Sequence, residues 1–398
     1  MDADLARWLV SADAVDALAE AGAQPDPGSM AAATTLRRRW APGQAAAVLT
    51  QAELRRRAVS KFGDAAGRLF FTRDALEQAT RSDVARWRAG RYVAAGATAV
   101  VDLGCGIGAD ALAFAAAGLT VVAVEADPAT AVLAGANLGG SGTVVCGDAV
   151  ELAGDLLADG AALFADPSRR TAAGRTWRVA DLTPSWAFVT GLLAGRDGCI
   201  KAAPGLPSGA IPDGVATTWV SHRGDLVEAS LWSGPWPPGS RTAVLLPSGR
   251  ELVAGERRDP PVGPIGRYLY EPDPAVIRAG ALSALAEVLD ARTPQTGIAY
   301  LSADTQRMTP FATAFEVLAE RPFDERGLRR WVQEQGVGTL EIKVRGLDVD
   351  PAVLRRRLKP SGKVSATLVL TPTPSGARAL VVRRLGGPSS SSGTVDES

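Results

Sequence analysis

The stretch Val100-Val101-Asp102-Leu103-Gly104-Cys105-Gly106-Ile107-Gly108 decides how this chain folds. It reads as a β-branched strand that breaks into a glycine-rich turn, and the apolar run Ala109 to Ala117 follows as a helix. Glycine lacks a Cβ, so this turn can bend tightly and lie against a flat ligand. The helix presents its N-terminal amides to the same place. This order of strand, glycine turn and helix predicts a nucleoside-binding α/β unit.

A second expected strand, Leu119 to Val124, ends at Glu125. A carboxylate at this position can accept hydrogen bonds from two ribose hydroxyls. The glycines are spaced G-x-G-x-G, whereas a dinucleotide fold uses G-x-G-x-x-G to approach a pyrophosphate. Asp102 precedes the first glycine by two residues, where it would repel a phosphate pair and favour a cationic amino acid. These details favour a cationic nucleoside cofactor.

At these residues the chain resembles the class I S-adenosylmethionine-dependent methyltransferases, whose first motif corresponds to Val101 to Gly108. The resemblance implies S-adenosylmethionine as cofactor, which carries a sulfonium and an ammonium and no phosphate. It also implies an acidic loop that holds the ribose, a loop whose acid meets the adenine amino group, and a fourth motif facing the methyl donor. The alternative is a glycine turn with acidic helix caps in another α/β fold. The cofactor-binding residues implied are Asp102, Gly104, Cys105, Gly106, Gly108, Glu125, Ala126, Asp127, Asp148, Ala149 and Asp166.

The run Phe164-Ala165-Asp166-Pro167-Ser168-Arg169-Arg170 stands where that family has its fourth motif. Methyl transfer needs alignment of the acceptor and, in some cases, removal of a proton. Asp166 is therefore expected to face the acceptor, and Pro167 to fix the loop. Arg169 and Arg170 could stack on a base or clamp a phosphate, or they could pair with acids such as Asp181 and only lock the loop.

The residues after Pro167 depart from the pattern of adenine amino-methyltransferases, which have a second proline and an aromatic residue there. This puts amine methylation of adenine in doubt without excluding it. Carbon methylation of a pyrimidine usually needs a cysteine nucleophile. Cys199 lies in an apolar strand with no activating neighbour, so covalent chemistry is not expected.

The chain is expected to contain an N-terminal helical region, residues 1–95, with one continuous helix from Arg73 to Ala95. Residues 96–258 alternate strands with helices, which predicts a Rossmann-like doubly wound α/β sheet. After a proline-rich linker, residues 266–385 are expected to form a small α+β domain, with Ala275 to Leu289 as a helix. The Ser/Gly-rich tail, residues 386–398, is expected to be disordered.

The C-terminal unit resembles the THUMP-like domain that follows a methyltransferase domain in a group of uncharacterised bacterial proteins. Val337 to Gly346 and Leu368 to Thr371 carry this likeness. THUMP domains proper bind tRNA, so the resemblance implies a role with RNA. Independently, basic residues are concentrated in this segment, although a solvated basic helix would look the same. The predicted RNA-binding residues are Lys343, Arg345, Arg355, Arg356 and Lys359.

Basic clusters also occur in the helical region, at Arg37 to Arg39 and at Arg55 to Arg57. They could grip phosphates, or their side chains could lie over apolar neighbours on a solvated helix face. Phe70, Phe71 and Thr72 could contact cofactor or substrate, or simply pack. The 43 basic and 43 acidic residues cancel, so no global basic field attracts nucleic acid.

The 398 residues suffice for two or three domains. Three cysteines without metal or disulfide spacing suit a reducing cytoplasm, and Cys146 and Cys199 are expected in buried strands. His222, the only histidine, is expected in a turn or at the surface, and no metal site is expected. Neither a signal peptide nor an apolar run long enough for a membrane span is expected.

Together these patterns predict an S-adenosylmethionine-dependent methyltransferase acting on a base nitrogen of tRNA or rRNA. A methyltransferase for a small metabolite is one alternative. An RNA-binding protein with a non-catalytic cofactor site is another, although the acids Asp102, Glu125, Asp148 and Asp166 are all present and count against it.

Overall fold

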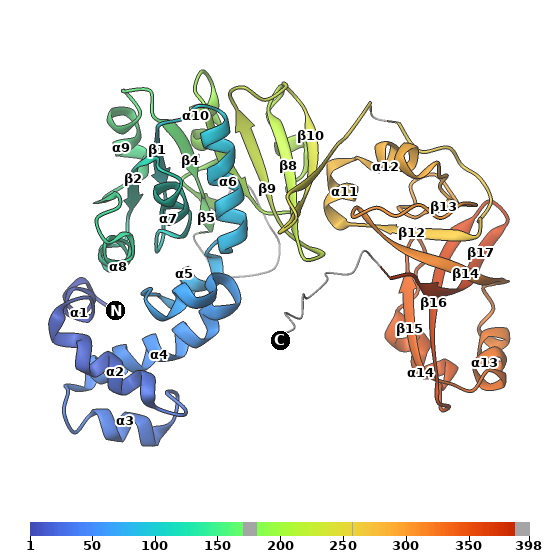
Figure 1. The fold of residues 1–398 in the computed structure, drawn as a ribbon, viewed down its shortest axis with the longest axis horizontal. Coiled ribbons are helices and arrows are strands. Elements are labelled where there is room, and N and C mark those ends of the chain that lie inside the picture. The colour runs from blue at the N-terminus through green and yellow to red at the C-terminus, as the bar shows by residue number, and fades with distance from the viewer. Residues whose placement is uncertain (170–180, 257, 387–398) are drawn as a thin grey trace, which may run out of the picture. The chain divides into compact units, whose positions relative to one another are not determined.

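The structure is a computed structural model that describes residues 1–169, 181–256 and 258–386. The chain divides into two compact units, the first made of residues 1–217 and 227–240. The second contains residues 218–226 and the chain from residue 241 onward. Figure 1 shows the helices and strands of both units, coloured along the sequence.

In the first unit, strands lie in the order β9-β7-β4-β1-β2-β3. The central strands pair in parallel, and β9 is antiparallel to β7. The strand order reverses at β1, between β2 and β4, which is where open α/β sheets bind ligands at the carboxyl ends of their strands. The doubly wound α/β fold predicted from the sequence is therefore confirmed. The bounds are β1 (Ala99–Leu103), β2 (Thr120–Glu125), β3 (Thr143–Cys146), β4 (Ala162–Ala165), β7 (Gly198–Ala202) and β9 (Asp225–Ser233).

Aromatic and apolar side chains hold the helices of this unit to the sheet. Phe114 of α7 meets Phe164 of β4 edge-on, with ring centroids 5.4 Å apart, and meets Tyr92 of α6 at 5.2 Å. All three rings are buried in one core with strand residues such as Val100. The remaining elements are α6 (Ser82–Ala94), α7 (Ala109–Ala116), α8 (Pro128–Leu138), α9 (Ala149–Leu156), α10 (Trp186–Leu193), β5 (Ser168–Arg169) and β6 (Leu182–Thr183). Strand β8 (Ala216–His222) begins in this unit, and most of its residues belong to the second unit.

The N-terminal helices pack directly onto the α/β sheet's own helix α8. Leu9 and Leu36 share a core with Ala129 and Leu133, which belong to α8. Because this interface is apolar and buried, the helical region is part of the same compact unit. Its elements are α1 (Ala3–Leu9), α2 (Val15–Ala23), α3 (Met30–Leu36), α4 (Pro42–Phe62) and α5 (Arg73–Gln78).

Two amide side chains clamp the extended segment after α4. Asn137 of α8 accepts a hydrogen bond from the Phe70 N–H (2.7 Å) and donates to the carbonyls of Phe70 (3.0 Å) and Ile107 (2.9 Å). Gln51 of α4 pairs in the same way with the N–H and carbonyl of Phe71. These bonds satisfy buried backbone groups that no strand pairs. Phe71 is fully buried, so it packs rather than facing a ligand.

The expected single helix from Arg73 to Ala95 is wrong: the structure has α5, then a break at residues 79–81, then α6. Lys61 ends α5 because its ammonium donates to the carbonyls of Leu76, Glu77 and Ala79 at 2.6–3.0 Å. A lysine that binds the last carbonyls of a helix is a common terminator.

Three further expectations are corrected. Residues 275–289 form two helices, α11 (Pro274–Ala279) and α12 (Leu282–Leu289), because Gly280 between them has φ +70°. His222 is buried at the end of β8, not in a turn. Cys146 is exposed, since it ends the edge strand β3.

The second unit contains a six-stranded sheet in the order β13-β12-β14-β17-β16-β15. One face carries α13 and α14, whose Leu328 and Leu354 share a core with Leu340 of β15. The other face carries Tyr300 and Phe315 in a separate core. Its remaining elements are β10 (Arg241–Leu246), β11 (Arg250–Val253), β12 (Tyr268–Pro272), β13 (Leu301–Ala303), β14 (Ala312–Pro322), α13 (Glu325–Glu334), β15 (Val337–Val344), α14 (Pro351–Leu358), β16 (Val364–Thr373) and β17 (Gly376–Arg384). The expected disorder of residues 387–398 lies outside the described residues.

Replacing Asn137 with leucine is expected to lower the thermal unfolding temperature of the protein by several degrees. The change leaves the Phe70 backbone groups and the Ile107 carbonyl without partners, and each buried polar group so orphaned costs about 1–3 kcal/mol. Gln333→Leu, at an exposed position of α13, is the matched control and should leave the unfolding temperature unchanged. Equal unfolding temperatures for the two variants would show that the hydrogen bonds of Asn137 to Phe70 and Ile107 do not stabilise the fold.

Candidate active site

A cavity of about 550 Å³ opens at the carboxyl ends of β1, β2, β3 and β4. Each strand contributes the residues that follow it, and α5 with the break after it supplies the facing wall. The wall residues used below are Thr72, Asp74, Gln78, Ala79, Thr80, Gly104, Cys105, Gly106, Asp110, Glu125, Ala126, Asp127, Asp148, Ala149 and Asp166.

The glycine turn is bound to the end of β2 by its backbone. The N–H groups of Gly104 and Cys105 both donate to the Val124 carbonyl, at 3.0 and 2.9 Å. Gly104 and Gly106 have φ angles of +90° and +57°, which favour glycine, and a Cβ on Gly106 would meet nothing within 4 Å. The turn therefore leaves open space beside its backbone.

Glu125 fixes the turn from the other side. Its Oε2 accepts a hydrogen bond from the Gly106 N–H at 3.0 Å, and its Oε1 accepts one from the Asp127 N–H at 2.9 Å. Burial raises the pKa of Glu125, although these N–H groups oppose the rise. Each oxygen can accept a further hydrogen bond, so the carboxylate can still bind two hydroxyls.

Two of the predicted cofactor acids also cap helices. Asp127 accepts a hydrogen bond from the Thr130 N–H (2.8 Å) at the start of α8, and Asp148 accepts one from the Val150 N–H (2.7 Å) at the start of α9. Both side chains belong to exposed residues of the cavity wall. A carboxylate can do both, because a capping bond uses one of its four acceptor sites.

Asp102, Gly108 and Pro167 do not line the cavity. Asp102 is fully buried beneath it, and neither oxygen has a hydrogen-bond partner among the described residues. Gly108 has a packing role instead, since a Cβ there would lie 2.8 Å from Leu138 Cδ1. Pro167 is buried. Arg169 belongs to β5, and Arg170 lies outside the described residues.

The charge of the wall tests which cofactor fits. Among its described residues are six carboxylates and no lysine or arginine. Such a wall repels phosphates and favours a ligand with positive charge. The unpartnered carboxyl of Asp102 under the glycine turn is a further acceptor without a donor. These carboxylates, which accept hydrogen bonds and carry negative charge, therefore fit a nucleoside that carries an ammonium and a sulfonium. The six are Asp74, Asp110, Glu125, Asp127, Asp148 and Asp166.

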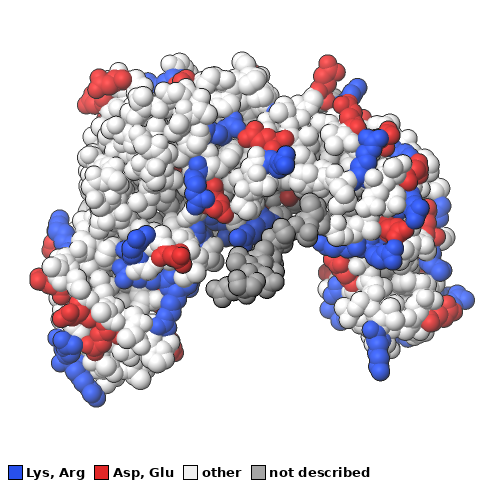
Figure 2. Space-filling model, in the orientation of Figure 1, with Lys and Arg blue, Asp and Glu red and all other residues white. Residues whose placement is uncertain are grey.

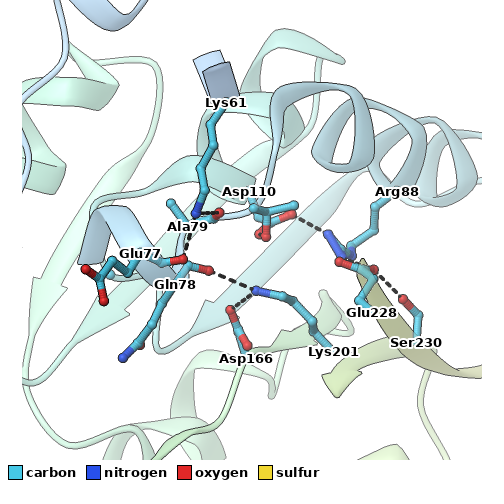
Figure 3. A network of polar contacts seen from close by, with 12 residues as sticks. Lys61, Glu77, Gln78, Ala79, Arg88, Asp110, Asp166, Lys201, Glu228 and Ser230 are labelled. Atoms are coloured by element: carbon cyan, nitrogen blue, oxygen red, sulfur yellow. Dashed lines mark hydrogen bonds and ion pairs between the residues drawn. The ribbon is translucent and has the colours of Figure 1, made fainter. Parts of the chain in front are cut away.

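A buried ionic network, missed at the sequence level, lies under this wall (Figure 3). Lys201 of β7 donates to Asp166 Oδ2 at 2.6 Å. Arg88 of α6 lies between Asp110 and Glu228, and its guanidinium is fully buried. Lys201 stands at the carboxyl end of the strand next to β4, which is the signal that could have identified it. No sequence pattern could have identified the pair of Arg88 and Glu228, because 140 residues separate them in the sequence.

The thiols of Cys105 and Cys199 are unsuited to nucleophilic chemistry. Burial raises the pKa of Cys199 to about 12, and it raises the pKa of Cys105 well above the usual range. Since the thiolate is the nucleophile, both remain protonated near neutral pH. Within the described ranges, no group of three or more His, Cys, Asp or Glu side chains could hold a metal ion.

The predicted RNA-binding residues do not form one patch. On β15, Leu340 and Ile342 face α13 and α14, whereas Lys343 and Arg345 reach Glu271 of β12 on the opposite face, at 2.8 and 3.8 Å. Three strands separate β12 from β15 in the sheet order, so the sheet must curl for this contact to form. Arg355, Arg356 and Lys359 lie in or just after α14, on the helical side.

The cluster from Arg55 to Arg57 is engaged by the protein itself, and in the other cluster Arg39 pairs with Glu20 at 2.9 Å. Arg56 donates to the carbonyls of Gly22, Gln24 and Pro25, and Arg55 donates to that of Leu69. These side chains hold the turn after α2 and the segment after α4. Among the residues that the structure describes, no helix is long and apolar enough to cross a membrane.

Comparison with known proteins agrees with this geometry. Curated relatives from two strains of Mycobacterium tuberculosis, CDC 1551 and H37Rv, are each named an uncharacterized S-adenosylmethionine-dependent methyltransferase. Each is 33% identical over 334 residues, which cover 81% of this chain and 92% of the relative. The chain belongs to this methyltransferase family. It is thus an S-adenosylmethionine-dependent enzyme, and the cofactor expected from the glycine turn is confirmed.

Two family models and one solved structure extend the comparison. Residues 312–384 match the THUMP domain-like family, which confirms the predicted resemblance, and residues 2–58 match a domain of unknown function, DUF8688. A crystal structure titled "putative methyltransferase", from Porphyromonas gingivalis W83, has a TM-score of 0.76. It is 22% identical, covers 93% of this chain and 98% of its own, and so shows a shared fold.

Glu125→Gln is expected to raise the dissociation constant of the methyltransferase for S-adenosylmethionine about tenfold to a hundredfold. The amide removes a charge and one acceptor oxygen, which weakens charge-assisted hydrogen bonds to hydroxyls and loosens the Gly106 turn. Isothermal titration calorimetry measures the change. Glu151→Gln, at an exposed position of α9, serves as control, and comparable affinities for both variants would remove Glu125 from the cofactor site.

Asp102→Asn is expected to raise the unfolding temperature of the cofactor-free enzyme, by roughly 2 °C or more at pH 8. Burial, with Asp110 and Asp166 nearby, raises the pKa of Asp102 well above its usual range. The folded protein then holds a proton that the unfolded chain releases above about pH 4, so Asp102 costs more stability as pH rises. The difference in unfolding temperature between the variant and the parent should therefore be smaller at pH 5. A difference that does not change with pH would contradict the raised pKa of Asp102.

Proposed function

We propose that this methyltransferase modifies a base nitrogen of RNA, with Asp166 as the residue that faces the acceptor. S-adenosylmethionine supplies the methyl group, with a neutral thioether as the leaving group. Asp166 would accept a hydrogen bond from the acceptor nitrogen, and the proton of the methylated nitrogen would pass to Asp166 or to solvent. The observation that carries the proposal is the position of Asp166 in the cavity wall at the end of β4.

Asp166 has the geometry of a hydrogen-bond acceptor for an N–H group. Lys201 occupies Oδ2, and its side chain and that of Asp166 are 15% and 30% exposed, so the carboxylate is held but reachable. An N–H donor that binds the other carboxylate oxygen would be held beside the cavity whose wall Asp166 forms. Alignment of this kind is the main contribution that a methyltransferase makes.

The C-terminal unit supports RNA as the substrate class. It contains a second cavity, of about 510 Å³, whose lining includes the cations Lys343, Arg345 and Arg384. The same lining holds two carboxylates, Asp273 and Glu271, and Glu271 pairs with both Lys343 and Arg345, so the three cations exceed the carboxylates by one charge. A cavity of this charge suits a phosphate group, and the THUMP-like resemblance favours RNA as its source.

On the face of the described residues that Figure 2 shows, basic and acidic side chains lie close to one another. Figure 2 shows Lys, Arg, Asp and Glu side chains interspersed there, in keeping with the zero net charge. Contact with RNA would therefore depend on local groups rather than on a long-range field.

Incubation of the enzyme with labelled S-adenosylmethionine and total cellular RNA tests the proposal. We expect label in one RNA nucleoside, identified by mass spectrometry as methylated on a ring or exocyclic nitrogen. Label found only in small molecules would favour the metabolite alternative instead. Tight cofactor binding without any transfer would favour the RNA-binding alternative.

Asp166→Asn is expected to lower kcat about a hundredfold, because the amide cannot take up a proton and orients an N–H donor poorly. The dissociation constant for S-adenosylmethionine should change less than threefold, about 0.6 kcal/mol. Single-turnover methylation separates the two effects. Asp155→Asn, which changes an exposed carboxylate of α9 outside the cavity wall, is the control, and an equal loss of kcat in both variants would contradict the proposed role of Asp166.

The double variant Arg345→Gln/Arg384→Gln is expected to weaken RNA binding at least tenfold. Loss of two phosphate contacts should reduce the slope of log affinity against log salt concentration by about 1.5. Filter binding from low to high salt measures both. Arg329→Gln/Arg330→Gln, two exposed positions of α13, is the matched control, and unchanged slopes in both would place the RNA elsewhere.

A further inference from the structure

Lys201 touches both the reacting side of the cavity and the segment that closes it. Its ammonium lies 2.6 Å from Asp166 Oδ2 and 3.4 Å from the carbonyl oxygen of Gln78. Gln78 is the last residue of α5, and Figure 3 shows Lys201 between it and Asp166. One cation thus joins a strand end of the α/β sheet to the N-terminal helical region.

The segment that follows Gln78 is fixed at two further points. Lys61 of α4 donates to the Ala79 carbonyl at 3.0 Å, and Thr80 Oγ1 donates to Asp110 Oδ2 at 2.6 Å. Gln78, Ala79 and Thr80 all line the cofactor cavity. The break between α5 and α6 is therefore a wall of the active site held by side chains from α4, α7 and β7.

The charges around Asp166 make Lys201 its main counterion. Asp110 of α7 and Asp102 of β1 act on it as like charges, and Arg88 of α6 and Lys201 of β7 act as opposite ones. Burial raises the pKa of Asp166, and Lys201 is the leading influence that lowers it. Arg88 is already bound to Asp110 and Glu228, so it cannot replace Lys201 at Asp166.

We infer that Lys201 is a positioning residue for methyl transfer: it holds Asp166 ionised, with one oxygen fixed and the other free for the acceptor. It also ties Asp166 to the Gln78–Thr80 wall, so the N-terminal helical region helps to shape the acceptor side of the site. This inference rests on the proposed role of Asp166.

Lys201→Met and Lys201→Arg test it in the full-length enzyme. Lys201→Met should lower kcat about a hundredfold, with cofactor affinity within threefold of the parent. Without its counterion, Asp166 should be protonated at higher pH, so the acid limb of the pH–kcat profile moves upward. Lys201→Arg keeps the charge and should restore most of the activity and the original acid limb. Lys363→Met, at an exposed lysine, is the control for loss of a positive charge.

A readout without RNA separates this inference from the proposed function. Infrared difference spectra at pH 7 between Lys201→Met and Lys201→Met/Asp166→Asn should show the band of a protonated carboxyl group. The same difference between the parent and Asp166→Asn should show a carboxylate. A carboxylate in both would overturn the inference even if RNA is methylated, as would an unchanged kcat and acid limb in Lys201→Met. If the parent enzyme does not methylate RNA, the proposed function fails. The infrared spectra still decide whether Lys201 keeps Asp166 ionised.

Discussion

The compensation of buried negative charge is the constraint on which this active site depends. Four carboxyl groups, Asp102, Asp110, Asp166 and Glu228, lie in or under the cofactor cavity, and two cations of the chain, Arg88 and Lys201, lie among them. A buried carboxylate without a counterion is costly, so the excess must be protonated or neutralised by a ligand. A cofactor that brings an ammonium and a sulfonium against a single carboxylate has a net positive charge and so supplies part of this compensation. The same charge balance disfavours nucleotides with phosphates.

The network also explains why three parts of the sequence form one unit. Arg88 comes from the helix before the first strand, Asp110 from the helix after the glycine turn, and Glu228 from the antiparallel strand β9. The N-terminal helices add Lys61, which ends α5 so that the following residues close the cavity. In this view the N-terminal region is a structural part of the active site. Its apolar contact with α8 makes it part of the same compact unit as the α/β sheet.

The sequence could predict most residues of the candidate cofactor site because they follow one another at fixed, local spacing. A glycine turn after a β-branched strand, and acids directly after the next strands, have fixed spacing, and most of those residues lie in the cavity wall. The glycine spacing alone assigns Gly108 to the cofactor. Its packing against Leu138 cannot be predicted from that spacing, because Leu138 lies on a helix 30 residues further along the chain. Arg88, Lys201 and the break after Gln78 could not be predicted, since their partners come together only when the sheet is assembled. Lys343 and Arg345 lie apart from Arg355, Arg356 and Lys359 because alternation along β15 directs Lys343 and Arg345 to the face opposite the one that α14 covers.

Calorimetric titration of the cofactor-free enzyme tests the charge argument most directly. The account predicts that S-adenosylmethionine binds at least tenfold more tightly than S-adenosylhomocysteine at low salt, because only the former carries the sulfonium charge, and that ATP and NADH do not bind. Equal affinity for the two adenosyl compounds, or uptake of ATP, would contradict the claim that this cavity is built for a cation.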